Sequence, residues 1–192
     1  MVYNNVMIDI ETLSVAHNAC ICTIAAVKFD INDDNSYKGF VNPENIFYVK
    51  VDIETCKAAG LDIDPNTVKW WNSQPEETKS EIFGTTDRIP LKLALIKLSK
   101  WITNPLFDMK VWCHGASFDC VILQNAFDIY RMSTPWKFWN IRDTRTLYDI
   151  ANIDLNEIKK ETSFASHHAL SDCYNQIIGV NKAVKKLSNN MV

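Results

Sequence analysis

The chain has 192 residues, of which 47% are hydrophobic, and its formal net charge at pH 7 is -3. This length and apolar content suit a single domain over residues 1–192 with one core, and they are short for two domains. The charge excludes a globally basic nucleic-acid-binding protein, although an acidic cleft that holds metal ions could still receive phosphates.

Cysteine usage and the N-terminal sequence indicate the cellular compartment of the protein. None of the six cysteines forms a Cys-x-x-Cys pair, and most lie among apolar residues, as buried free thiols do. The N-terminus shows no signal-peptide pattern, and no apolar run approaches membrane-spanning length. We therefore expect a soluble cytoplasmic protein without a membrane partner, and we leave a homodimer open.

The first predicted element is a strand over residues 6–12 that carries two carboxylates. Ile8 and Ile10 face one side of this strand, and Asp9 and Glu11 face the other, because side chains alternate along a strand. Two carboxylates on one face repel each other, and inside a fold a divalent cation such as Mg²⁺ or Mn²⁺ can neutralise them. The pattern predicts a metal site, and the alternative is an edge strand with a solvated acidic face.

The tetrapeptide Asp-Ile-Glu-Thr occurs twice, at residues 9–12 and again at 52–55, so it is not specific by itself. The first copy ends an apolar strand and precedes a β-rich segment. The second copy enters a polar or helical stretch without a following strand. We therefore interpret Asp52 and Glu54 as surface residues.

The later elements alternate between strands and helices, which predicts an α/β fold with a central mixed sheet flanked by helices. In chain order we expect a strand over 20–30 closed by a turn over 32–36, a strand over 45–51, a helix that starts at Asp64, a helix over 90–101, a strand over 109–114, and helices over 118–130, 144–151 and 169–187.

Three further residues are ambiguous when each is taken alone. Asp119 follows a glycine turn at the start of a helix, where it could simply cap the helix. Asp172 lies in the first turns of the last helix, where the helix dipole favours a carboxylate. His167 precedes it, and the spacing His167-x4-Asp172 lets the histidine lean over a metal site that Asp172 helps to hold.

Together these residues resemble the three motifs of the DEDDh exonucleases: Asp9-x-Glu11, Phe118-Asp119 and His167-x4-Asp172. Further segments resemble a compact RNase T-like subgroup that contains phage DexA-type exodeoxyribonucleases and small bacterial 3′–5′ exoribonucleases. These segments are 67–71, 112–123, 142–147 and 167–172. The resemblance covers nearly the whole chain, and one departure is His114, where asparagine is expected.

The resemblance implies a ribonuclease H-like fold and a 3′–5′ exonuclease that releases nucleoside 5′-monophosphates from single-stranded nucleic acid, with DNA slightly favoured over RNA. It implies two Mg²⁺ or Mn²⁺ ions held by Asp9, Glu11, Asp119 and Asp172. His167 is the expected general base, because an imidazole with an unperturbed pKa of ~6.5 can take a proton from water at physiological pH. The expected location is the cytoplasm of a bacterium or of a phage-infected cell.

Four candidate substrate contacts each have an alternative. By resemblance, Leu13 and the Thr12 backbone would meet the terminal nucleotide and Phe118 would pack against a base or sugar, yet these residues could instead belong to the core. Arg142 is a candidate phosphate contact, and an ion pair with Asp143 is equally consistent.

Trp70 and Trp71 are the remaining candidates for substrate binding. Neighbours on a helix point about 100° apart, so only one of the two rings readily faces the core. The other ring could stack on a base of any sequence, and partial burial is the alternative.

Two other hypotheses use the same chain differently. The first is a zinc site built from the set His17, Cys20, Cys22, Cys113 and His114, which lacks the usual Cys-x-x-Cys spacing. The second is a catalytically silent module that grips nucleic-acid ends, although all five chemical positions of the exonuclease motifs are present.

Overall fold

A computed structural model describes residues 3–32, 42–104, 108–162, 164 and 167–189. Its described part contains a six-stranded sheet in the order β4-β3-β2-β1-β5-β6. The neighbours β1/β2 and β2/β3 are antiparallel, and β1/β5, β5/β6 and β3/β4 are parallel, so the sheet is mixed as expected. The strands are β1 (Asn5–Thr12), β2 (Ile21–Phe29), β3 (Ile46–Val51), β4 (Arg88–Ile89), β5 (Lys110–Cys113) and β6 (Ile141–Asp143).

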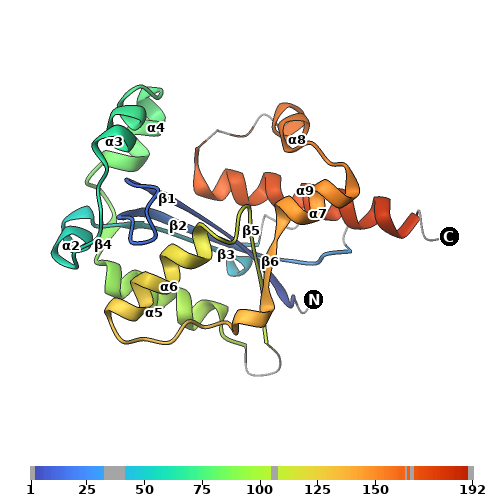
Figure 1. Cartoon of the computed structure of the whole chain (residues 1–192), viewed down its shortest axis with the longest axis horizontal. Helices are drawn as coiled ribbons and strands as arrows, with labels where there is room; N and C mark the ends of the chain where they lie inside the picture. Colours follow the sequence, from blue (N-terminus) through green and yellow to red (C-terminus); the bar gives the residue numbers. More distant parts are fainter. Residues whose placement is uncertain (1–2, 33–41, 105–107, 163, 165–166, 190–192) are drawn as a thin grey trace.

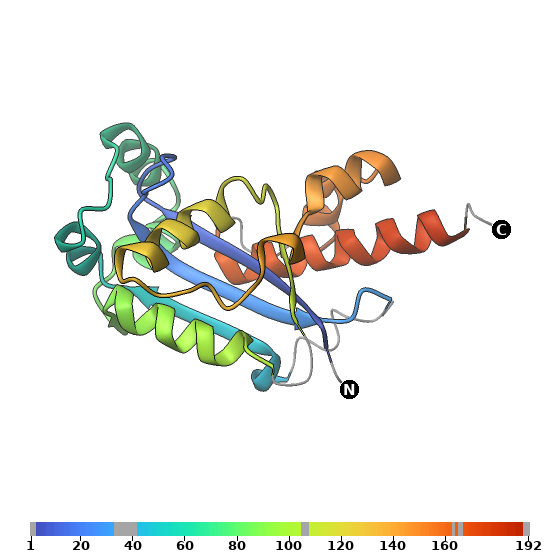
Figure 2. The same ribbon diagram turned by 60° about the horizontal axis from the view of Figure 1, so that its bottom comes forward.

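Helices cover both faces of this sheet, with α7 and α9 on one face and α5 and α6 on the other (Figure 1, Figure 2). The α-helices are α2 (Ile53–Ala58), α3 (Pro65–Asn72), α4 (Glu76–Phe83), α5 (Leu91–Ile102), α6 (Asp119–Ile129), α7 (Thr144–Ala151), α8 (Leu155–Thr162) and α9 (Ala169–Asn189), with 3₁₀ helices η1 (Pro43–Asn45) and η2 (Phe138–Asn140). None of the described helices combines the length and apolar character needed to cross a membrane.

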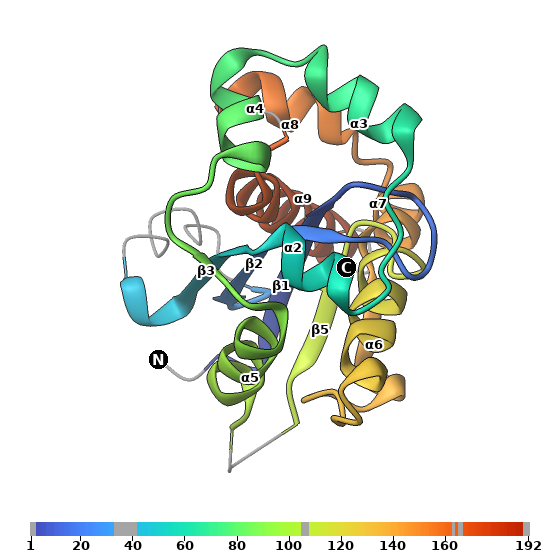
Figure 3. The same ribbon diagram turned by 90° about the vertical axis from the view of Figure 1, so that its left-hand side faces the viewer.

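β1 lies in the middle of the sheet and has a different core on each side. Ile8 and Ile10 are buried in the core that includes residues of α5 and α6, whereas Met7 is buried in the core that includes residues of α7 and α9. Because side chains alternate along a strand, Asp9 and Glu11 fall on the side of Met7 and therefore face α9. Figure 3 shows α9 and α5 on opposite sides of β1.

The interpretation of β1 as a solvated edge strand is wrong. β1 is hydrogen-bonded to β2 along its whole length and to β5 on its other side. The pairing with β5 involves only Asn5, Met7 and the residue between them. Beyond Met7 the pairing with β5 ends, so the main-chain groups on that edge of β1 are available to other partners.

The predicted strands and long helices are confirmed, and the shortest elements were missed. β4 and β6 have two and three residues, which is too few for an alternating pattern to be recognised. The helices α4 and α8 were also missed. The turn expected over 32–36 lies outside the described residues except for its first position.

The second Asp-Ile-Glu-Thr copy lies at the surface, as expected. Asp52 is the N-cap of α2, where its side chain accepts a hydrogen bond from the main-chain nitrogen of Glu54. Glu54 is exposed and pairs with Lys57 at 2.6 Å. This copy therefore has an ordinary structural role at a helix start.

Candidate active site

Three carboxylates from two elements meet on the α9 side of β1. Oxygens of Asp9 and Glu11 on β1 and of Asp172 in the first turn of α9 all lie within 4.8 Å of one another. Asp9 and Glu11 are half-buried, and Asp172 is 7% exposed. The alternation of β1 and the crossing of α9 over the strand bring together residues that are about 160 positions apart in the sequence.

Asp119 is hydrogen-bonded to the same strand, at the edge of β1 that does not pair with β2. It lies at the start of α6, is 4% exposed, and accepts a hydrogen bond from the main-chain nitrogen of Ile10 at 3.2 Å. Phe118, and not Asp119, is the N-cap of this helix. The capping alternative is therefore wrong, because the Asp119 carboxylate bonds to β1 where β5 no longer pairs with it.

Burial and mutual repulsion make the charged forms of these carboxylates unfavourable. The pKa of Asp9 is raised well above its usual value, first by burial and then by the charges of Asp119 and Asp172. The pKa of Glu11 is raised by burial and by Asp9 and Asp172. Burial also raises the pKa of Asp119. A cation close to these carboxylates would stabilise their charged forms.

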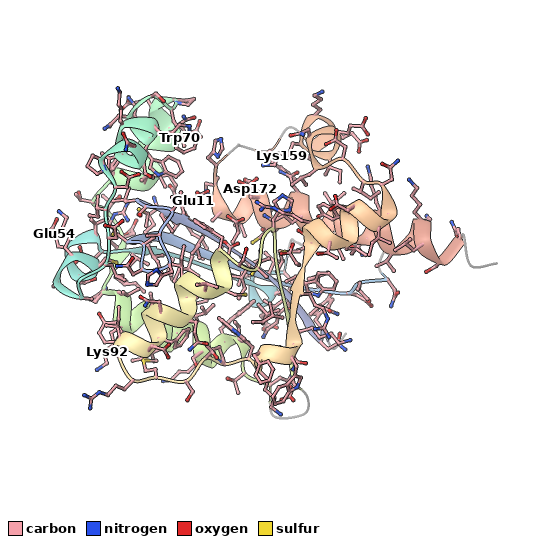
Figure 4. All side chains as sticks on the ribbon, in the orientation of Figure 1. Glu11, Glu54, Trp70, Lys92, Lys159 and Asp172 are labelled. Atoms are coloured by element: carbon pink, nitrogen blue, oxygen red, sulfur yellow. The ribbon has the colours of Figure 1, made fainter. Side chains whose placement is uncertain are left out.

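Two residues that the sequence analysis did not select complete the site. Gln176 on α9 donates a hydrogen bond from Nε2 to Oδ1 of Asp9 at 2.8 Å, and Lys159 on α8 pairs with Oδ1 of Asp172 at 2.6 Å. Gln176 follows Asp172 by four positions, which places both on one face of α9 and is the signal that could have found it. Lys159 has no such local signal. Figure 4 shows Lys159 and Asp172 pointing toward one another, with Glu11 nearby on β1.

The two adjacent histidines have different surroundings. The ring of His167 lies edge-on to Trp70, with 4.9 Å between the ring centroids, and also contacts Trp71. The ring of His168 stacks on Tyr48, with 5.3 Å between the centroids, away from these tryptophans. Burial lowers the pKa of His167, and the charge of Asp172 acts in the opposite direction. Burial therefore favours the neutral form of the His167 imidazole.

A cavity of about 410 Å³ lies beside the carboxylates and is bordered by Glu11, Thr12, Trp70, Trp71 and Phe118, among others. Four of the six candidate substrate contacts thus line it. Trp71 is 2% exposed and donates from Nε1 to the carbonyl oxygen of Thr12 at 2.8 Å, whereas Trp70 is 43% exposed. The division into one buried and one exposed tryptophan was expected.

The other two candidates lie outside the lining of this cavity. Leu13 is 2% exposed and belongs to the core, so its side chain does not border this cavity. Arg142 lies on β6 at the edge of the sheet and donates to the carbonyl oxygens of Trp139 and Ile141, each at 2.9 Å. The carbonyls, and not Asp143, are its partners.

The zinc hypothesis does not fit the structure. All six cysteines are buried and free, and the Nδ1 atom of His114 lies 2.8 Å from Oγ1 of Thr144. Within the described part of the chain, the group of side chains gathered closely enough to hold a metal is Asp9, Glu11 and Asp172. None of the zinc candidates belongs to it.

Comparison with known proteins identifies the family of the chain. A family model described as the 3′–5′ exoribonuclease Rv2179c-like domain matches residues 4–184. The chain belongs to this family. Among curated proteins, the exodeoxyribonuclease of Enterobacteria phage T4 is 24% identical over 204 residues, which cover 93% of this chain and 88% of the relative.

Solved structures share the fold. The nuclease domain of 3′hExo, a DEDDh family member bound to rAMP, superposes with a TM-score of 0.57 at 12% identity, over 97% of this chain and 93% of that one. E. coli exonuclease I in complex with a dA16 oligonucleotide gives a TM-score of 0.58 at 16% identity, over 97% of this chain and 40% of that one. The family match confirms the expected 3′–5′ exonuclease, and the structural neighbours, one of which is a DEDDh family member, confirm the expected ribonuclease H-like fold.

Proposed function

We propose that the protein removes nucleotides one at a time from the 3′ end of single-stranded nucleic acid, using two divalent ions held by Asp9, Glu11, Asp119 and Asp172. The observation that carries this proposal is the gathering of three carboxylates within 4.8 Å of one another where burial raises the pKa of Asp9 and of Glu11. Such a cluster is unfavourable by itself, and a divalent cation removes its repulsion.

The donor set fits Mg²⁺ or Mn²⁺. Every proposed ligand offers carboxylate oxygen, which is the ligand type that these hard ions prefer. When bound, the ions supply Lewis-acid activation of a water and charge stabilisation at the leaving 3′ oxygen. Gln176 orients Asp9, and the main-chain nitrogen of Ile10 orients Asp119, so two of the ligands are held in place by hydrogen bonds.

His167 is the proposed general base. Its burial favours the neutral imidazole, which accepts the proton of the attacking water on a ring nitrogen. The charge of Asp172 then stabilises the imidazolium that forms, since the same charge acts to raise the pKa of His167. The rings of Trp70 and Trp71 pack edge-on against the imidazole and restrict its orientation.

The cavity beside Glu11 would receive the terminal nucleotide. Trp70, which is 43% exposed on its border, offers a face on which a base of any sequence can stack. We place single-stranded DNA first, because the phage T4 relative that aligns over 93% of this chain is an exodeoxyribonuclease. RNA is the second proposed substrate, because the family model is described as an exoribonuclease domain. The cytoplasm is the proposed location, and residues 1–192 are proposed to act as one domain.

A time course on 5′-labelled single-stranded DNA and RNA of one sequence, with Mg²⁺, Mn²⁺ or EDTA, tests the proposal. We expect products shortened stepwise from the 3′ end with either ion and none in EDTA, with the faster substrate identifying the preferred sugar. Asp9→Asn should abolish the products, and Asp52→Asn in the second tetrapeptide should retain them. Binding of the 3′ end without shortening under every condition would instead favour the silent module.

A further inference from the structure

Lys159 forms an unusual ion pair at the edge of the carboxylate cluster. Its ammonium lies 2.6 Å from Oδ1 of Asp172, and the side chain of Asp172 in this pair is only 10% exposed. Among the ion pairs of the described residues, this is the least exposed carboxylate. The pair between Lys57 and Glu54 is typical of the surface, with side chains 50% and 75% exposed. A pair of that surface kind contributes little, whereas a cation beside a buried carboxylate matters more.

The charge of Lys159 reaches beyond Asp172. Oxygens of Asp172, Asp9 and Glu11 lie within 4.8 Å of one another, so an ammonium 2.6 Å from Asp172 also lies close to the other two carboxylates. Lys159 therefore offsets part of the negative charge of the whole cluster. Its ammonium occupies one oxygen of a residue that is also a proposed metal ligand.

The helix that carries Lys159 is anchored by other contacts. Ile158 is buried, Oγ1 of Thr162 donates to Oδ1 of Asn175 on α9 at 2.6 Å, and Lys182 pairs with Glu161 at 2.6 Å. Because these contacts hold α8 against α9, the long flexible Lys159 side chain can withdraw its ammonium while the helix stays in place.

We propose that Lys159 is a resident counter-ion of the metal site: it neutralises Asp172 in the ion-free protein and competes with a divalent ion for that carboxylate. The inference rests on the proposed metal-dependent function and adds a residue that sets its ion affinity. An ion-free cluster without Lys159 would keep all of its repulsion. A bound ion next to Lys159 must either displace the ammonium or tolerate its positive charge. The side chain therefore lowers ion affinity in return for stability of the ion-free enzyme.

Titration of Mn²⁺ alone into the full-length protein, freed of metal beforehand, tests the competition. Lys159→Met keeps the apolar stem and removes the charge, so we expect Mn²⁺ to bind on the order of tenfold more tightly, as follows from removing one unit charge close to a divalent ion in a hydrated site. Lys159→Arg keeps the charge and should bind Mn²⁺ like the wild type. Lys160→Met removes the exposed neighbouring charge on the same helix and is the matched control.

Thermal unfolding in EDTA tests the second half of the inference. Lys159→Met should lower the melting temperature, since Asp172 loses its counter-ion, and the same substitution should lose this effect in the Asp172→Asn background. Lys160→Met should leave the melting temperature unchanged. This readout needs neither bound metal nor activity.

The possible outcomes separate this inference from the proposed function. If the wild type binds Mn²⁺ and Asp9→Asn does not, the metal site stands whatever Lys159 does. Equal Mn²⁺ affinity of the wild type and Lys159→Met, or an unchanged melting temperature of Lys159→Met in EDTA, would overturn the role of Lys159. Absence of Mn²⁺ binding in both proteins would overturn the metal site and the role of Lys159 together.

Discussion

Replacing Asp9 by asparagine should remove activity and yet stabilise the ion-free protein. Asparagine retains the side-chain oxygen that accepts the hydrogen bond from Gln176, a buried residue that is 3% exposed. It removes one negative charge from a group whose oxygens lie within 4.8 Å of one another. The substitution therefore isolates charge from packing, which Asp9→Ala would not do, because the amide of Gln176 would lose its partner.

The size of the effect follows from Coulomb's law. Two unit charges at the 4.8 Å limit repel by about 0.9 kcal/mol in water and by about 3.5 kcal/mol at an effective dielectric constant of ~20. Asp9 has two such neighbours, Glu11 and Asp172, and Lys159 offsets part of their charge. We expect Asp9→Asn to raise the free energy of unfolding in EDTA by about 1–3 kcal/mol, or the melting temperature by roughly 2–12 °C for a chain of this size.

The stabilisation should depend on pH in a defined direction. Because the folded-state pKa of Asp9 is raised above its usual value of 3.8, protonated Asp9 favours the folded state below pH 3.8, and this contribution is lost as pH rises through the raised pKa. Asp9→Asn should therefore be more stable than the wild type at neutral pH, and the difference should disappear in acid.

Thermal unfolding in EDTA at pH 7.5 and at acidic pH, followed by circular dichroism, measures this difference. Asp52→Asn is the control, since asparagine also caps helices and Asp52 is the N-cap of α2. A lower melting temperature of Asp9→Asn at pH 7.5 would refute the argument that repulsion dominates this site. Full exonuclease activity of Asp9→Asn would refute the two-ion mechanism itself.

Further predictions concern the histidines and tryptophans. His167→Ala should retain Mn²⁺ binding but lose on the order of 10²–10⁴ in single-turnover rate. The wild-type rate should fall as the pH is lowered through the pKa of His167, which burial places below 6.5, because the protonated imidazole cannot accept a proton. His167→Ala should lack this acidic limb of the pH profile, and His168→Ala should keep it. The reverse pattern would mean that the base is misassigned. Trp70→Ala should raise the KM for oligonucleotides without lowering the melting temperature, and an unchanged KM would exclude stacking on this ring. Trp71→Ala should cost about 3–5 kcal/mol of stability by chemical denaturation, because its ring is buried, and a loss below about 1 kcal/mol would contradict that packing.

Several features of this protein are determined by its sequence alone. The alternation in residues 6–12 puts Asp9 and Glu11 on one face and Ile8 and Ile10 on the other, whichever helix later covers the strand. The context of the two Asp-Ile-Glu-Thr copies distinguishes a strand from a helix start. These predictions succeed because period and capping depend on neighbours within a few positions.

The assembly of the site is decided only by the tertiary structure. The hydrogen bond from Ile10 to Asp119 joins residues 109 positions apart, and that from Gln176 to Asp9 spans 167 positions. No local pattern encodes which helix crosses which strand, so Lys159 could not be assigned beforehand, and Gln176 could have been found only through its four-residue spacing from Asp172. The burial of Leu13 is decided in the same way, because burial depends on the elements that pack around a side chain and not on its neighbours in sequence.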